Sequence, residues 1–148
     1  MTDAVLSASR VLVAVAARSL AELSDDVSLS QYRVLVVLAS RGPQVVGAVA
    51  DQLDVLPSTA TRLCDRLVRK GLVAREHPLS SRREVEVSLT DQGRLLVEGV
   101  TTRRRRAITE IVRAIPPANR EALITALGQF AEAAGEVPEQ AWSLGWGS

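Results

Sequence analysis

The residues best suited to chemistry in this sequence are cations concentrated between positions 62 and 83. Seven basic side chains stand there against two acidic ones, Asp65 and Glu76; the basic residues are Arg62, Arg66, Arg69, Lys70, Arg75, Arg82 and Arg83. The segment therefore has a formal charge of +5, although the whole chain has a net charge of only +1 and the remaining residues sum to −4. Concentrated positive charge suits contact with phosphate groups, because their neutralisation releases condensed counterions. The alternative interpretation is a solvated helix face.

Three short hydroxyl side chains, Ser58, Thr59 and Thr61, lie just before the first of these cations. Pro57 fits the first turn of a helix that would contain both sets. Hydroxyl side chains of this size reach phosphates or base edges without blocking entry into a DNA groove, and the positive end of the helix dipole favours phosphate. Together the two sets predict a DNA-binding helix.

Other chemistries lack the side chains that they need. The chain has one cysteine, Cys64, and one histidine, His77, which excludes an intramolecular disulfide and the usual cluster of metal ligands. No phosphate-binding glycine loop and no acid, base and nucleophile set is present. We therefore expect no enzyme, catalytic residue, metal or cofactor. Cys64 is expected to pack inertly in the core and His77 to lie in a surface loop.

The chain of 148 residues is long enough for one domain. Its longest uninterrupted apolar run, Val11 to Ala17, ends at arginines on both sides and is far shorter than the roughly 20 residues of a membrane span. The first residues lack the basic region of a signal peptide. These features predict a cytoplasmic protein without membrane contact.

Apolar periodicity predicts six helices that would position the cations. Ser30 and Thr90 are the expected N-caps of the second and fifth helices, and Gly71 is expected just beyond the fourth. The predicted helices are Val5–Leu23, a helix from Ser30 to about Ser40, Val45–Leu53, Pro57–Lys70, Asp91–Ile115 and Ala118–Ala134.

Two strands are predicted between the fourth and fifth helices. Leu72–Glu76 and the alternating segment Arg83–Leu89 would pair antiparallel across a turn at His77–Arg82. Three short helices followed by a hairpin are typical of a winged helix-turn-helix, with Pro57–Lys70 as the recognition helix. The predicted fold class is thus mainly α (α+β).

The sequence resembles the MarR family of bacterial transcriptional regulators. The order and spacing of five segments support the resemblance: Leu29–Leu35, Val49–Leu53, Pro57–Leu63, Asp65–Val73 and Ser88–Gly93. The resemblance covers nearly the whole chain and implies a single MarR-type domain over residues 1–148. It also implies a winged helix-turn-helix body at 29–90, with N- and C-terminal dimerisation helices at 1–24 and 91–135.

The resemblance implies a ligand-responsive homodimeric repressor that binds double-stranded DNA at a pseudo-palindromic operator. Its implied DNA-binding residues are Ser58, Thr59, Thr61 and Arg62 in the major groove, Arg66 at a phosphate, Arg69 on the same helix, and Arg82 and Arg83 in the wing. Arg83 matches the family's minor-groove arginine. The family usually has Asp where this chain has Ser81, which leaves room for a different wing geometry or operator preference, with Arg82 as an alternative groove contact.

The ligand that the resemblance implies is a small aromatic or lipophilic molecule, bound between the dimer helices and the DNA-binding body, with Tyr32 as a lining candidate. Arg103–Arg106 point in four directions on a helix, which favours solvation and ion pairing with acidic helices such as the one ending at Asp25-Asp26 over an anion contact. Trp142 and Trp146 could pack across the dimer or remain mobile. The competing function is a winged-helix protein-interaction module without specific DNA binding.

Overall fold

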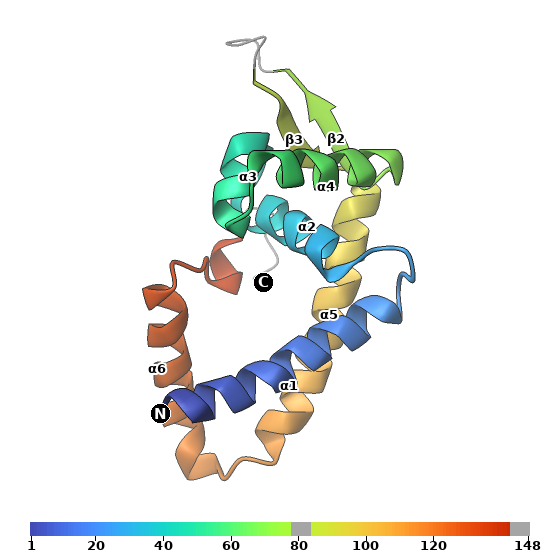
Figure 1. Cartoon of the computed structure of the whole chain (residues 1–148). Coiled ribbons are helices and arrows are strands. Elements are labelled where there is room, and N and C mark those ends of the chain that lie inside the picture. Colours follow the sequence, from blue (N-terminus) through green and yellow to red (C-terminus); the bar gives the residue numbers. More distant parts are fainter. Residues whose placement is uncertain (78–83, 143–148) are drawn as a thin grey trace. The chain divides into compact units, whose positions relative to one another are not determined.

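The computed structural model describes residues 1–77 and 84–142, which form two compact units (Figure 1). The first unit comprises Met1–Val27 and Glu98–Glu136, and the second comprises Ser28–Val97 with the C-terminal segment from Val137. Helix α5 (Asp91–Arg113) contributes residues to both units. Each unit is described by itself below.

The second unit is built on three helices, α2 (Leu29–Arg41), α3 (Val46–Leu53) and α4 (Pro57–Arg69). Helix α4 packs against both α2 and α3. Apolar residues at helical spacing bury one face of each helix, as the periodicity predicts. The buried core residues of these helices are Tyr32, Val34, Leu35, Leu38, Ala39, Val49, Ala50, Leu53, Ala60, Leu63, Cys64 and Leu67.

Helix α2 begins earlier than the sequence pattern predicts, because its N-cap is Ser28 and not Ser30. The Ser28 hydroxyl accepts a hydrogen bond from the Gln31 backbone N–H at 3.1 Å, and the Gln31 side chain accepts one from the Ser28 N–H at 3.4 Å. This reciprocal pair is a capping box, which needs Glu or Gln three residues after the cap. Ser28 has Gln31 at that position, whereas Ser30 has Arg33, which cannot accept the second bond.

The sheet has three antiparallel strands in the order β1 (Gln44–Val45), β3 (Glu86–Leu89) and β2 (Val73–Glu76). The predicted hairpin is confirmed in its pairing, with Val73 opposite Leu89 and Glu76 opposite Glu86, but each strand is shorter than predicted. The sequence prediction missed β1, because two residues show no alternation. Val45 belongs to β1, so the prediction that it starts the third helix was wrong.

The two ends of the β2–β3 segment are fixed by the residues that the sequence indicates. Gly71 has a φ of +74°, which ends α4 in a left-handed conformation that glycine adopts without strain. The Thr90 hydroxyl accepts from the Gly93 N–H at 3.1 Å and donates to the Gly71 carbonyl at 2.6 Å. Thr90 therefore caps α5 and ties its start to the end of α4.

The first unit contains α1 (Thr2–Ala21), α6 (Pro117–Ala133) and the part of α5 from Glu98. Arg103 is ion-paired with Glu22 at 2.8 Å, so the predicted pairing of the arginine run with an acidic helix is found, although at Glu22 and not at Asp25-Asp26. Helix α6 buries none of its residues, and α1 buries three. Large apolar side chains of this unit are exposed: Val5, Leu6, Val11, Leu12, Val13, Leu23, Ile111, Ile124, Leu127 and Phe130.

Among the described residues, α1 is the one helix whose length and mean hydropathy, 1.5 over 18 residues, would suffice for a membrane span. A count of uninterrupted apolar residues stops at Arg10 and Arg18, whereas an average over the helix tolerates them, so the two criteria differ. A helix that packs its apolar side against protein passes the same test of average hydropathy.

The segment after α6 returns to the second unit through a short 3-10 helix, η1 (Glu139–Ala141). Trp142 is 6% exposed, and its indole N–H donates to the Val137 carbonyl at 3.1 Å. Trp142 is thus buried within its own chain. Trp146 lies outside the described residues.

Candidate nucleic-acid interface

The predicted recognition helix, α4, is amphipathic along its whole length. Ser58, Thr61, Arg62, Arg66 and Arg69 are exposed, and Thr59 is half-buried. Spacings of three and four residues place Ser58, Arg62, Arg66 and Arg69 along one stripe of the helix surface, with Thr59 and Thr61 at its two edges. Leu56 is the N-cap and supplies no side-chain hydrogen bond, so the first turn keeps N–H groups that a phosphate can accept from.

The arginines of this stripe are not neutralised by the rest of the described chain. Arg62, Arg66 and Arg69 form no ion pair with any described residue. The acidic residue of the helix, Asp65, is instead ion-paired with Arg75 of β2. The positive charge of the stripe is therefore available to an external anion.

Lys70 serves a structural purpose at the end of the same helix. Its ammonium group donates to the Gln31 side-chain oxygen at 2.8 Å, and this oxygen also belongs to the capping box of α2. The contact ties the end of α4 to the start of α2. The orientation of the recognition helix is thus fixed at both ends, by Pro57 and by this bond.

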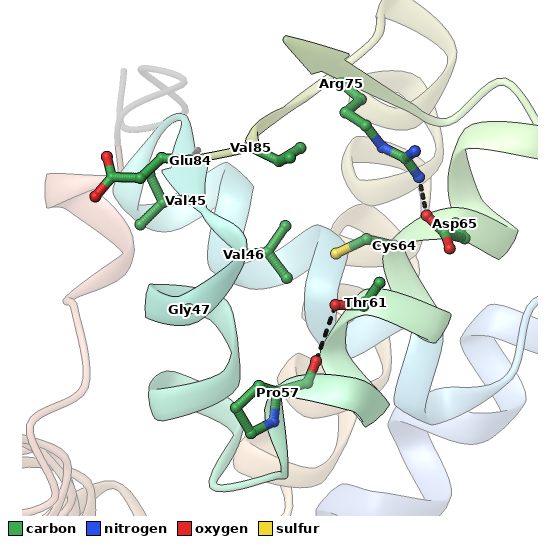
Figure 2. A pocket seen from close by; sticks show the side chains of 10 residues that line it. All are labelled: Val45, Val46, Gly47, Pro57, Thr61, Cys64, Asp65, Arg75, Glu84 and Val85. Carbon is green, nitrogen blue, oxygen red and sulfur yellow. Dashed lines mark hydrogen bonds and ion pairs between the residues drawn. The ribbon is translucent and has the colours of Figure 1, made fainter. Parts of the chain in front are cut away.

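A pocket of about 450 Å³ lies between α3, α4 and the β-sheet (Figure 2). The Thr61 hydroxyl lines it and donates to the Pro57 carbonyl at 3.0 Å, and the Asp65–Arg75 ion pair closes one side. Val45, Val46 and Val85 supply apolar walls. Thr61, predicted for the major groove, therefore lies at the sheet side of α4.

Figure 2 shows the Cys64 sulfur at the wall of this pocket. Burial raises the pKa of the Cys64 thiol, and the nearby Arg75 guanidinium only partly opposes this effect. The thiol consequently stays protonated at neutral pH, which agrees with the predicted inert packing. Among the described residues, no group of three or more His, Cys, Asp and Glu side chains could hold a metal ion.

A second hollow, of about 330 Å³, lies on the opposite edge of the recognition helix, against α2. We call it the α2–α4 hollow. It receives Thr59, Arg62 and Arg66, three of the predicted DNA-binding residues, together with Arg33, which the sequence analysis missed. No sequence signal distinguishes Arg33, because its place beside α4 depends on how the helices pack. The other lining residues are Ser28, Ser30, Leu53, Val55 and Leu63.

The remaining predicted site residues have different positions. The wing residues Ser81, Arg82 and Arg83 lie outside the described residues. Tyr32 is 4% exposed and lines neither of the two hollows. His77 is exposed beyond β2, as predicted, and its ring Nδ1 lies 3.2 Å from the Glu84 carbonyl oxygen.

Known proteins with similar sequences and folds are regulators of transcription. The MarR family model matches residues 27–85. The uncharacterized HTH-type transcriptional regulator ML2140 of Mycobacterium leprae is 34% identical over 115 residues, which cover 77% of this chain and 80% of ML2140. The structure of RV1404 from Mycobacterium tuberculosis superposes with a TM-score of 0.87 at 43% identity, covering 93% of this chain and 94% of that one.

A relative with a more specific name matches over a shorter stretch. The HTH-type transcriptional repressor MdtR of Bacillus subtilis is 37% identical over 81 residues, or 55% of this chain. The match spans 52% of MdtR's own length. It therefore covers about half of each protein.

Proposed function

Because this chain belongs to the MarR family, whose members are transcriptional regulators and not enzymes, we propose that it is a sequence-specific, homodimeric repressor. Its affinity for a pseudo-palindromic operator would fall when a small molecule binds. The observation that carries this proposal is the exposed arginine stripe of α4, which no described acidic residue neutralises. Since its DNA is the chromosome, we place the protein in the cytoplasm and away from membranes.

The proposed contacts follow the position of each side chain on α4. Ser58 and Arg62 lie on the exposed stripe near the N-terminal half of the helix, where base edges of the major groove come within reach, with Thr59 and Thr61 at the edges. Arg66 and Arg69 lie toward the C-terminal half and would contact phosphates. Arg82 and Arg83 would enter the minor groove, where narrow A·T-rich segments attract guanidinium groups.

A second copy of the chain is the proposed cover for the exposed apolar side chains of the first unit. Single domains rarely leave so many large apolar residues in water, and α6 alone exposes Ile124, Leu127 and Phe130. We assign the dimerisation helices to residues 1–24 and 91–135 and the DNA-binding body to 29–90, within one MarR-type domain. Two recognition helices must lie about 34 Å apart to reach successive major grooves.

Repression and ligand control are proposed from the relatives and from thermodynamic linkage. MdtR is named a transcriptional repressor, and it shares 37% identity over half of this chain. A ligand can release DNA only by binding better to a conformation with a different spacing of the recognition helices. The proposed ligand is a small aromatic or lipophilic molecule near Tyr32.

Binding to the DNA upstream of the protein's own gene tests the proposal. Fluorescence anisotropy should show preference for this DNA over a random duplex, and affinity should fall about 10³- to 10⁵-fold between 50 and 200 mM salt if six to ten phosphates are contacted. The same shallow salt dependence on both duplexes, or no shift at low salt, would favour a protein-interaction module instead. A monomer in light scattering at micromolar concentration would refute the dimer.

Two variants separate base contact from phosphate contact. Arg62→Ala should weaken operator binding by about 1–3 kcal/mol and relax specificity, whereas Arg66→Ala should weaken binding to all sequences alike. Equal losses on operator and random DNA for both variants would contradict the assignment of Arg62 to a base. DNase footprints recorded with and without phenolic compounds would then test ligand control.

A further inference from the structure

Arg33 brings a third guanidinium group to the α2–α4 hollow, from a helix other than the recognition helix. It shares this hollow with Arg62 and Arg66 of α4. The hydroxyl side chains of Ser28, Ser30 and Thr59 also line it, and no acidic side chain does. Cations and hydroxyl donors around a hollow of about 330 Å³ are suited to an oxyanion.

The charges of this hollow are not balanced within the described chain. Arg33 is exposed, and neither it nor Arg62 nor Arg66 forms an ion pair with any described residue. Like charges that line one hollow repel each other, and an anion between them removes this repulsion. Guanidinium groups bind phosphate with paired hydrogen bonds, which suits a phosphate better than a spherical ion.

The position of Arg33 indicates which phosphate it would meet. A helix in the major groove has a phosphate backbone on each side, and only residues on the helix itself reach the base edges at the groove floor. Arg33 lies beside α4 on α2, at the edge that carries Thr59 and Arg66. We propose that Arg33 binds a backbone phosphate of the DNA together with Arg66, so that the α2–α4 hollow clamps the strand at one side of the groove. This inference rests on the proposed DNA-binding function.

The salt dependence of DNA binding measures the number of such contacts. Arg33→Ala should weaken binding at 50 mM salt by about tenfold per subunit, and hence about a hundredfold for a dimer, on operator and random duplexes alike. The salt slope should fall by about 0.9 per lost contact, so the advantage of the wild-type dimer should shrink about twelvefold between 50 and 200 mM. An unchanged slope, or a loss confined to the operator, would overturn the inference.

Arg41→Ala is the matched control, because Arg41 is an exposed arginine at the other end of the same helix and does not line the hollow. It should leave the salt slope within error of the wild type. Arg33→Lys should recover most of the slope but not all of the affinity, since lysine keeps the charge and loses the paired geometry. If Arg41→Ala reduced the slope as much as Arg33→Ala, a specific contact at the hollow would be refuted.

Duplexes with a single uncharged methylphosphonate identify the phosphate and separate DNA from free phosphate as its source. One position in each half-site should weaken wild-type binding and cost Arg33→Ala nothing further. Equal costs in both proteins at every position would refute the backbone contact and leave free phosphate as the occupant. A wild type that prefers no duplex would refute the proposed function, whereas specific binding with a normal Arg33→Ala variant would refute only this inference.

Discussion

Replacing Gly93 by alanine tests whether the start of α5 is pressed against the turn that follows α4. A Cβ at Gly93 would overlap the Leu72 carbonyl oxygen, lie 3.1 Å from the Leu72 carbonyl carbon and lie 3.3 Å from a methyl group of Leu89. The Leu72 carbonyl also accepts the Thr90 N–H at 3.2 Å, so it cannot move away freely. The backbone itself must shift to make room.

Two opposing effects set the magnitude. Overpacking against backbone costs about 3 kcal/mol, at the upper end of the usual range. Alanine in a helix gains about 1 kcal/mol over glycine, largely because the unfolded chain loses freedom. We therefore expect Gly93→Ala to lower the free energy of unfolding by about 2 kcal/mol.

Gly47→Ala is the matched control in the same unit, because a Cβ at Gly47 of α3 would meet nothing within 4 Å. It should raise the free energy of unfolding by up to about 1 kcal/mol. For a urea m-value of about 2 kcal/mol/M, the midpoints of the two variants should differ by about 1.5 M. Both must be measured at one protein concentration, since dimer stability depends on it. A Gly93→Ala midpoint at or above that of the wild type would refute the close approach.

Three further predictions concern single side chains. Thr90→Val removes the hydroxyl that bonds Gly93 and Gly71 and should lower the free energy of unfolding by about 1–2 kcal/mol, whereas Thr90→Ser should stay close to the wild type; equal urea midpoints for Val and wild type would contradict the cap. Burial raises the pKa of Cys64 above its ordinary value of 9.0, so iodoacetamide should alkylate the folded protein at pH 7.5 much more slowly than the urea-unfolded chain. The unfolded thiol ionises first as pH rises, so the wild type should lose stability relative to Cys64→Val above about pH 9, and a constant difference from pH 8 to 10 would contradict the raised pKa. Asp65→Asn breaks a half-exposed ion pair with Arg75 and should change stability by less than about 1 kcal/mol while strengthening binding to random DNA in anisotropy titrations; weaker binding would show that Asp65 aids the interface.

Local signals in the sequence were sufficient for much of the fold. The spacing of Ala60, Leu63 and Leu67 identifies the buried face of α4, and Gly71 and Thr90 lie at the helix ends that their chemistry predicts. Errors arose where a local signal was short or ambiguous. Strand β1 has two residues, and the choice between Ser28 and Ser30 depended on the residue three positions later.

The candidate site divides in the same way. The arginine stripe of α4 follows from helical spacing alone, so sequence reasoning could place it on one face. Arg33 is eleven residues from Gly42 and Pro43 in neither direction a motif, and it meets Arg66 only because α2 packs against α4. Similarly, the pairing of Asp65 with Arg75 depends on where β2 runs after Gly71. Contacts between elements need the tertiary structure.

The near absence of lysine from the candidate interface makes its charge permanent. Lys70 is the single lysine of the chain, and its ammonium group is engaged with Gln31. The other cations of α4 are arginines, which do not lose their proton at any pH found in a cell. Lysine acetylation therefore has no exposed arginine of the stripe to neutralise, and mild acidification or alkalinity leaves the stripe's charge unchanged. Control of DNA binding must act on the spacing and orientation of these helices and not on the sign or number of their charges.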